Sequence, residues 1–210
     1  KGPGSGHPSN SCVSATAMGT YKICELFSVP RLSALPEVQR EGRISFTEPP
    51  NFDKETGWDF FDASDRAQFW ACLREQKPDL VLMSTECRPF SILMSSNWDR
   101  MSEGEALRIK TQGMAMLQFC IQVAAYQLEH GRQFLLEQPG SASSWATHAM
   151  KWLEEQLGVF MVQFDQCAAG LSLKPDTLSR KTTSCISNHL GLISSLSELR
   201  CSRDHEHLQL

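Results

Sequence analysis

Short apolar runs recur along this chain and alternate with amphipathic stretches. The run Leu80–Met83 has no helical period and ends in a polar turn, which is typical of a buried strand. The other runs that predict strands are Tyr21–Phe27, Arg43–Thr47, Trp58–Phe61, Gln133–Glu137, Val159–Phe164 and Lys181–Ser187.

Helical periodicity fills most of the intervals between these strands. A capping-box sequence, Ser102–Glu105, predicts a helix that runs to about His130 and stops at Gly131. Further helices are predicted at Ala34–Arg40, Ser64–Gln76, Ser144–Gln156 and Ile193–Leu199. The prolines and glycine of 48–57 predict a loop there, and a second loop passes through Gly170 and Pro175.

This alternation predicts an α/β, Rossmann-like fold with a mostly parallel sheet and helices on both faces. Only a loop separates Val159–Phe164 from Lys181–Ser187, so these two strands should form a late antiparallel hairpin. Residues 1–20 are rich in Gly and Ser and predict a flexible lead-in, whereas 21–210 predict a single domain.

Composition excludes a general electrostatic attraction for nucleic acid. The 210 residues are 41% hydrophobic and carry a net charge of −4, so any nucleic-acid contact has to be local. No apolar run approaches the roughly 18 residues of a membrane span, and no membrane contact is expected. The eight cysteines are scattered, which favours reduced thiols and an intracellular protein, nuclear or cytoplasmic. The chain opens on Lys1 without a signal-peptide pattern, and we expect it to be a piece of a longer protein.

The stretch Asp79–Ser91 is the first candidate for a site. It leads from a buried strand directly to Cys87 and Arg88, and ligands of open α/β sheets bind beyond the carboxyl ends of the strands. Glu137 follows another buried strand and should lie at the same edge. Simpler roles stay open: Cys87 as a small buried residue, and Glu137 as an acceptor for backbone N–H groups.

The strand ends, taken in order over roughly 22–187, resemble those of class I S-adenosylmethionine-dependent methyltransferases, and in particular the DNA cytosine methyltransferases. Glu25-Leu-Phe-Ser28 resembles the Phe-x-Gly-x-Gly loop of that family, although Val29-Pro30-Arg31 replaces its glycines. Gly57-Trp-Asp59 resembles the Gly-Asp-Ile element, and Thr85-Glu-Cys-Arg-Pro-Phe-Ser91 resembles the Pro-Pro-Cys-Gln-Pro-Phe-Ser loop. Glu137-Gln-Pro139 is similar to the Glu-Asn-Val strand end, and Ser179-Arg-Lys-Thr182 to the Gln-x-Arg-x-Arg element.

This resemblance implies a cofactor, a mechanism and a partner. The cofactor would be S-adenosylmethionine, held by Phe27, Ser28, Asp59, Ser84 and an acidic residue for the ribose, either Glu48 or Asp53. Asp59 and Asp62 could instead be helix caps.

The mechanism that the resemblance implies would use Cys87 as the nucleophile and Glu137 as the acid, with Arg88 and Arg180 holding phosphate or base. The partner would be nucleic acid, in the first place DNA. Only 181–210 follow Arg180, so we expect no separate target-recognition domain.

A second resemblance concerns the parent protein. Phe134-Leu-Leu-Glu-Gln-Pro, Asp165-Gln-Cys, Arg180-Lys-Thr-Thr and His205-Glu-His-Leu are similar to a methyltransferase-like segment of retrotransposon polyproteins. It implies flanking polyprotein domains as partners. It also gives the alternative function, a catalytically inactive interaction module within such a polyprotein.

The C-terminal part of the chain contains a separate pattern of metal-ligand types. Cys185-x-x-x-His189 is followed by Cys201-x-x-x-His205-x-His207. Thiolates and imidazoles suit a tetrahedral zinc ion, so Cys185, His189, Cys201 and His205 are candidate ligands of a structural zinc. The alternative is a set of solvated histidines and buried thiols without a metal.

Overall fold

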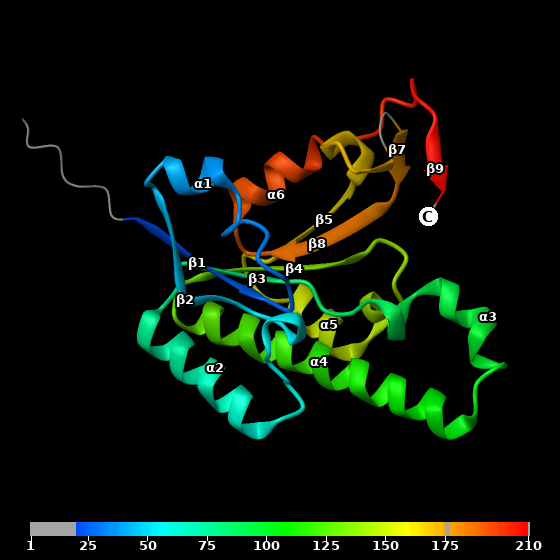
Figure 1. Cartoon of the computed structure of the whole chain (residues 1–210), viewed down its shortest axis with the longest axis horizontal. Coiled ribbons are helices and arrows are strands. Elements are labelled where there is room, and N and C mark those ends of the chain that lie inside the picture. The colour runs from blue at the N-terminus through cyan, green and yellow to red at the C-terminus, as the bar shows by residue number, and fades with distance from the viewer. Residues whose placement is uncertain (1–19, 175–176, 210) are drawn as a thin grey trace, which may run out of the picture.

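The computed structural model describes residues 20–174 and 177–209 (Figure 1). Apart from residue 20, the predicted lead-in lies outside the described residues. The strands of the main sheet are β1 (Tyr21–Leu26), β2 (Ile44–Phe52), β3 (Leu80–Met83), β4 (Gln133–Pro139), β5 (Phe160–Asp165) and β8 (Thr182–Ser187). A small second sheet contains β6 (Ser172–Lys174), β7 (Thr177–Arg180) and β9 (His207–Gln209).

The helices alternate with these strands. The α-helices are α1 (Pro36–Arg40), α2 (Ala63–Gln76), α3 (Ser95–Trp98), α4 (Glu103–Glu129), α5 (His148–Glu154) and α6 (Leu190–Ser197). Short 3-10 turns are η1 (Lys54–Thr56), η2 (Arg88–Phe90), η3 (Ile92–Met94), η4 (Ser143–Ala146) and η5 (Gln166–Ala169). The predicted helix at Ser144–Gln156 is therefore two pieces, η4 and α5.

The main sheet has the order β2-β1-β3-β4-β8-β5. β1 pairs in parallel with β2 and β3, and β3 pairs in parallel with β4. β8 runs antiparallel to both β4 and β5. The mostly parallel sheet and the late antiparallel hairpin are thus confirmed, and the carboxyl ends of β1, β2, β3 and β4 share one edge.

Helices cover both faces of the sheet, as predicted: α2, α4 and α5 lie on one face and α1 and α6 on the other (Figure 1). The larger hydrophobic core lies under α2, α4 and α5. Its fully buried members include Phe52, Phe69, Leu117, Phe134 and Leu153. A smaller cluster around Val162, Phe164 and Cys185 packs against leucines and an isoleucine of the α6 region.

The longest helix, α4, has the boundaries that the sequence predicts. The Ser102 hydroxyl accepts a hydrogen bond from the Glu105 N–H at 3.3 Å, which satisfies one free donor of the first turn. Gly131 has a φ of +65° just beyond the last turn, a conformation that glycine adopts without steric cost.

Two predictions near β2 are wrong. β2 extends to Phe52 and includes Pro49 and Pro50, where a loop was expected; β2 is an edge strand, and an edge tolerates residues that lack an N–H. Trp58–Phe61 is not a strand but a turn. The Asp59 carboxylate accepts the Phe61 N–H at 2.9 Å, and local bonds of this kind compete with strand pairing.

The connection within the late hairpin was also predicted incompletely. Instead of a simple loop it contains η5 and the first two strands of the small sheet. β9, near the end of the chain, pairs in parallel with β7 and completes that sheet. These strands have only three or four residues each, which is too short for an alternating pattern to be recognised.

Candidate functional site

A cleft of about 700 Å³ opens beyond the carboxyl ends of β1, β2 and β3. Its walls come from the segments that follow these strands and from the first half of α4. The lining residues are Phe27, Asp53, Lys54, Trp58, Asp59, Phe60, Phe61, Ser84, Glu86, Arg88, Pro89, Arg108, Ile109, Gln112, Gly113 and Met116. The cleft therefore lies where the strand topology predicts a ligand site.

Aromatic rings form an apolar wall of this cleft. The Phe27 ring packs edge-on against Phe60, with ring centroids 4.7 Å apart, and Phe60 in turn contacts Phe119 of α4 at 5.2 Å. Phe27 has a φ of 56°, which is uncommon for a bulky residue and turns the chain sharply at the end of β1. Trp58 packs on the buried Phe52 at 4.7 Å. The rings of this wall belong to the core or pack against it.

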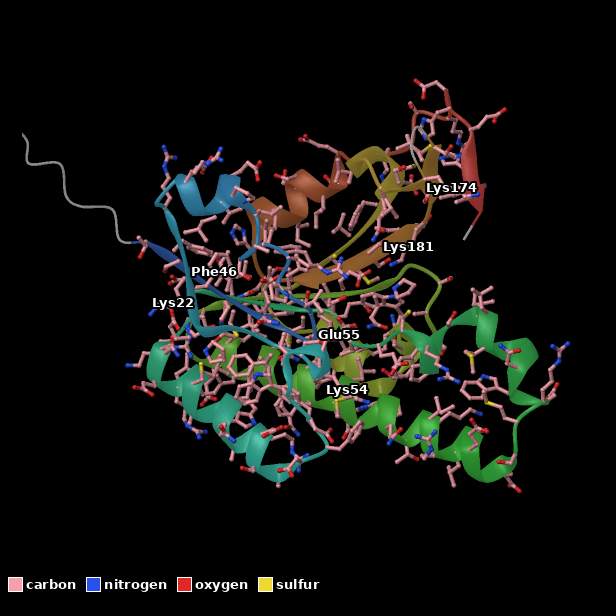
Figure 2. All side chains as sticks on the ribbon, viewed as in Figure 1. Lys22, Phe46, Lys54, Glu55, Lys174 and Lys181 are labelled. Carbon is pink, nitrogen blue, oxygen red and sulfur yellow. The ribbon has the colours of Figure 1, made fainter. Side chains whose placement is uncertain are left out.

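Both signs of charge line the cleft. Asp53, Asp59 and Glu86 are the acidic members, and Lys54, Arg88 and Arg108 are the basic ones. Figure 2 labels Lys54 on the turn that follows β2. The mixture is suited to a ligand that carries both a cationic and an anionic group.

Three of the five predicted cofactor residues line the cleft: Phe27, Asp59 and Ser84. Ser28 and Glu48 do not. The Ser28 hydroxyl donates to the Val29 carbonyl at 3.0 Å, and Glu48 is an exposed residue within β2. Asp53, the other acidic residue considered for the ribose, follows the last residue of β2 and does line the cleft.

The loop after β1 is closed by a carboxylate and not by glycines. Glu25 is only 2% exposed, and its oxygens accept the N–H groups of Arg31, Leu32 and Ser33 at 3.2–3.3 Å. A buried carboxylate needs such partners. Sequence reasoning missed this role, although an acidic residue between apolar neighbours in a buried strand was the available signal.

The segment that carries Cys87 is fixed from two sides. On one side, the buried Gln138 of β4 donates from Nε2 to the Thr85 carbonyl at 3.2 Å and to the Thr85 hydroxyl at 2.6 Å. On the other side, Pro89 packs against Gly113 of α4. In the Pro-Pro-Cys-Gln-Pro-Phe-Ser loop that this segment resembles, a proline stands at the position of Thr85. Here the hydrogen bonds from Gln138 hold the backbone at that position instead.

Cys87 is an exposed free cysteine, so the alternative of a small buried residue is wrong. Its neighbours Glu86 and Arg88 line the cleft, whereas Cys87 itself lies just outside the lining. Cys87 is thus an exposed residue between two residues that line the cleft.

Glu137 lies beside the residue that follows β3. The Ser84 hydroxyl donates to Glu137 Oε2 at 2.7 Å. The other oxygen, Oε1, is buried without a hydrogen-bond partner among the described residues, and Lys181 Nζ is 3.9 Å away. Figure 2 labels Lys181, which precedes β8. Sequence reasoning missed Lys181, because only the pairing of β8 with β4 brings it to Glu137.

Arg180 does not line the cleft. It ends β7 and lines a second depression of about 420 Å³, together with Asp165, Arg203 and four potential metal ligands. Cys87 and Glu137 do not line the cleft either, so the grouping of these residues with Arg180 stays a prediction.

The four potential ligands are Cys167, Cys201, His205 and His207, whose ligand atoms all lie within 4.8 Å of one another. Two of the predicted ligands, Cys201 and His205, belong to this cluster. The other two do not: Cys185 is buried in β8, and His189 caps α6 by accepting the Leu192 N–H at 3.2 Å. Cys167 and His207 take their places.

Comparison with known proteins adds no relative: a scan against protein-family models found no match, and a search of curated proteins found none either. Within 20–174 and 177–209, no helix combines the length and the hydrophobicity that a membrane span requires.

Proposed function

We propose that this chain has a class I methyltransferase fold and transfers a methyl group from S-adenosylmethionine to cytosine in nucleic acid. The observation that carries the proposal is the cleft beyond β1, β2 and β3, with the exposed Cys87 between two of its lining residues, Glu86 and Arg88. Its volume of about 700 Å³ is within the roughly 300–1,000 Å³ that is typical of small-molecule sites.

The lining of the cleft suits this cofactor. Trp58 and Phe61 offer aromatic surface for a flat base, and Asp53 offers a carboxylate for ribose hydroxyls. Asp59 and Glu86 add negative charge for a sulfonium cation. When bound, S-adenosylmethionine would supply a methyl group activated by that sulfonium charge.

The residues of the chain would activate the base. The Cys87 thiolate would add to carbon 6 of cytosine, which forms an S–C bond and shifts electron density to carbon 5. Glu137, in its acid form, would hold a proton at ring nitrogen 3. The methyl donor would leave as a neutral thioether, and transfer of the carbon-5 proton to water would then restore the 5,6 double bond, break the S–C bond and release the thiolate. The target base would have to leave the duplex to reach the cleft.

Two experiments test this function in sequence. Calorimetric titration of the intact chain should detect S-adenosylmethionine binding at or below about 1 mM. An oligonucleotide containing 5-fluorocytosine should then form a covalent adduct that Cys87→Ala abolishes and the control Cys72→Ala retains. Duplex DNA, single-stranded DNA and RNA versions identify the substrate. A chain that binds no cofactor, or an adduct that survives Cys87→Ala, contradicts the proposal.

One observation favours a second function, a catalytically inactive interaction module of a larger polyprotein. The N–H groups of Arg31, Leu32 and Ser33 after β1 are already bound by Glu25, so these groups are occupied within the protein. A folded chain that binds neither cofactor nor oligonucleotide would support this function.

A further inference from the structure

Three side chains near the C-terminus, those of Cys201, His205 and His207, have the spacing of ligands in a tetrahedral metal site. Cys201 Sγ is 3.7 Å from His205 Nε2 and 3.4 Å from His207 Nε2, and the two Nε2 atoms are 3.0 Å apart. Tetrahedral zinc, with Zn–S near 2.3 Å and Zn–N near 2.0–2.1 Å, separates a sulfur from a nitrogen by about 3.5 Å and two nitrogens by about 3.3 Å. The observed spacing is close to these values.

Cys167 is the fourth member, and it comes from a different part of the fold. It lies in η5, directly after the main-sheet strand β5, and is 4% exposed. His207 lies in β9, where it pairs with Leu178 of β7. The cluster therefore joins the main sheet to the C-terminal segment.

Groups around the cluster orient its ligands. Asp204 Oδ1 is 2.9 Å from His205 Nδ1, which leaves Nε2 of that ring to face the other three ligands. The Arg203 N–H donates to Cys201 Sγ at 3.4 Å, and Arg203 reaches this position with a φ of 62°. Carboxylate–imidazole pairs of this kind are usual around zinc, because they fix the ring and its tautomer.

The C-terminal segment has little else to hold it in place. Between Arg200 and Leu208 no residue is buried. The Cys201 N–H donates to the Asp165 carboxylate at 3.1 Å, and β9 pairs with β7 over three residues; these contacts connect the segment to the rest of the fold. Segments without apolar burial open at low free-energy cost, so an ordered segment here requires a further constraint.

We propose that Cys167, Cys201, His205 and His207 bind one zinc ion, which fastens the C-terminal segment to η5. Two thiolates and two imidazoles in tetrahedral arrangement suit zinc, and four protein ligands leave no open position, so the site is structural and not catalytic. The proposal is independent of the methyltransferase function, because the ligands lie outside the cleft.

Metal content and cobalt substitution of the intact chain test the site. Protein purified without chelators should contain one zinc per chain by elemental mass spectrometry. Replacement with Co²⁺ should give the visible bands of a tetrahedral ion and a near-ultraviolet charge-transfer band from two thiolates. A folded protein that contains no metal when purified without chelators would overturn the proposal. A Cys167–Cys201 disulfide, or failure of the chain to bind Zn²⁺ or Co²⁺, would also overturn it.

Single substitutions identify the ligands. Cys167→Ser and His207→Asn should each weaken Co²⁺ binding at least tenfold and change the visible spectrum. The matched controls are Cys87→Ser, an exposed thiol elsewhere, and His189→Asn, which can still cap α6. If a ligand variant does not fold, titration of the unsubstituted chain with Co²⁺ still counts the thiolates. Loss of metal in Cys185→Ala or His189→Asn with retention in Cys167→Ser would contradict the ligand set.

Discussion

Pro89 rests directly on Gly113 of α4. A Cβ atom added to Gly113 would lie 2.4 Å from Pro89 Cβ and 2.5 Å from Pro89 Cγ, closer than non-bonded carbons approach. Both residues line the cleft. A glycine in the interior of this long helix costs about 1 kcal/mol relative to alanine, and here it allows η2 to pack against α4.

Gly113→Ala should therefore displace η2 and destabilise the protein. We expect a net loss of up to about 2 kcal/mol in the free energy of unfolding, because overpacking costs about 1–3 kcal/mol and the gain in helix propensity returns about 1 kcal/mol. Gly104→Ala is the matched control: nothing lies within 4 Å of its added Cβ, so it should be neutral or stabilising. Denaturant unfolding measures both variants, and an unfolding free energy for Gly113→Ala equal to that of Gly104→Ala would show that the contact has no effect.

Asp53→Asn and Glu48→Gln distinguish the two acidic residues considered for the ribose. Asp53→Asn should weaken S-adenosylmethionine binding by at least tenfold, because a carboxylate binds hydroxyl groups more strongly than an amide does. Asparagine can still cap η1, so the local fold should persist. Glu48→Gln should leave the affinity unchanged, since Glu48 does not line the cleft. Calorimetry with the same cofactor decides between them, and the reverse order of affinities would move the ribose site to Glu48.

Among the cysteines in 20–174 and 177–209, Cys87 should be the first thiol that reacts with an alkylating reagent. It is exposed, whereas Cys24 and Cys185 are buried and burial raises the pKa of each to about 12. At about pH 8 these two thiols are therefore almost entirely protonated and also inaccessible. Iodoacetamide labelling of the native chain, followed by peptide mass mapping, measures the order. Labelling of Cys24 as fast as Cys87 would be incompatible with the described packing.

Glu137→Gln should reduce methyl transfer without a large change in the stability of the protein. The amide oxygen of glutamine can still accept the Ser84 hydroxyl, and the ion pair with Lys181 is partly exposed and worth at most about 1 kcal/mol. The melting temperature should change little. Methyl transfer should fall by about 10²–10⁴-fold, because an amide cannot act as the acid at ring nitrogen 3. A variant with full activity would remove Glu137 from the mechanism while leaving the cofactor site untouched.

The main sheet could be predicted from the sequence because its strands are apolar runs bounded by clear turn and cap signals. The late hairpin followed from the absence of a helix between two such runs, and α4 followed from Ser102 and Gly131. The short strands β6, β7 and β9 could not be predicted, since three or four residues do not establish a period. The strand prediction for Trp58–Phe61 was wrong because the Asp59 carboxylate accepts the Phe61 N–H and forms a turn, despite the aromatic-rich composition.

The candidate site was predictable only where it lies at strand ends. Parallel strands bring their carboxyl ends together, which places Phe27 after β1 and Ser84 after β3 at one edge. Asp59 joins them from a turn, in a segment that the sequence predicted to be a strand. Tertiary structure decided which residues join them: Asp53 lines the cleft, and Arg180 lies elsewhere.

The metal cluster was also predicted in part from the sequence and completed only by the fold. Cysteine and histidine at the end of the chain were visible as ligand types, but spacing alone paired them with Cys185 and His189. Only the fold brings Cys167 to the cluster, because it follows β5, beside which the C-terminal segment returns. Local sequence determines the elements and their chemistry, whereas contacts between distant segments depend on how the whole core packs.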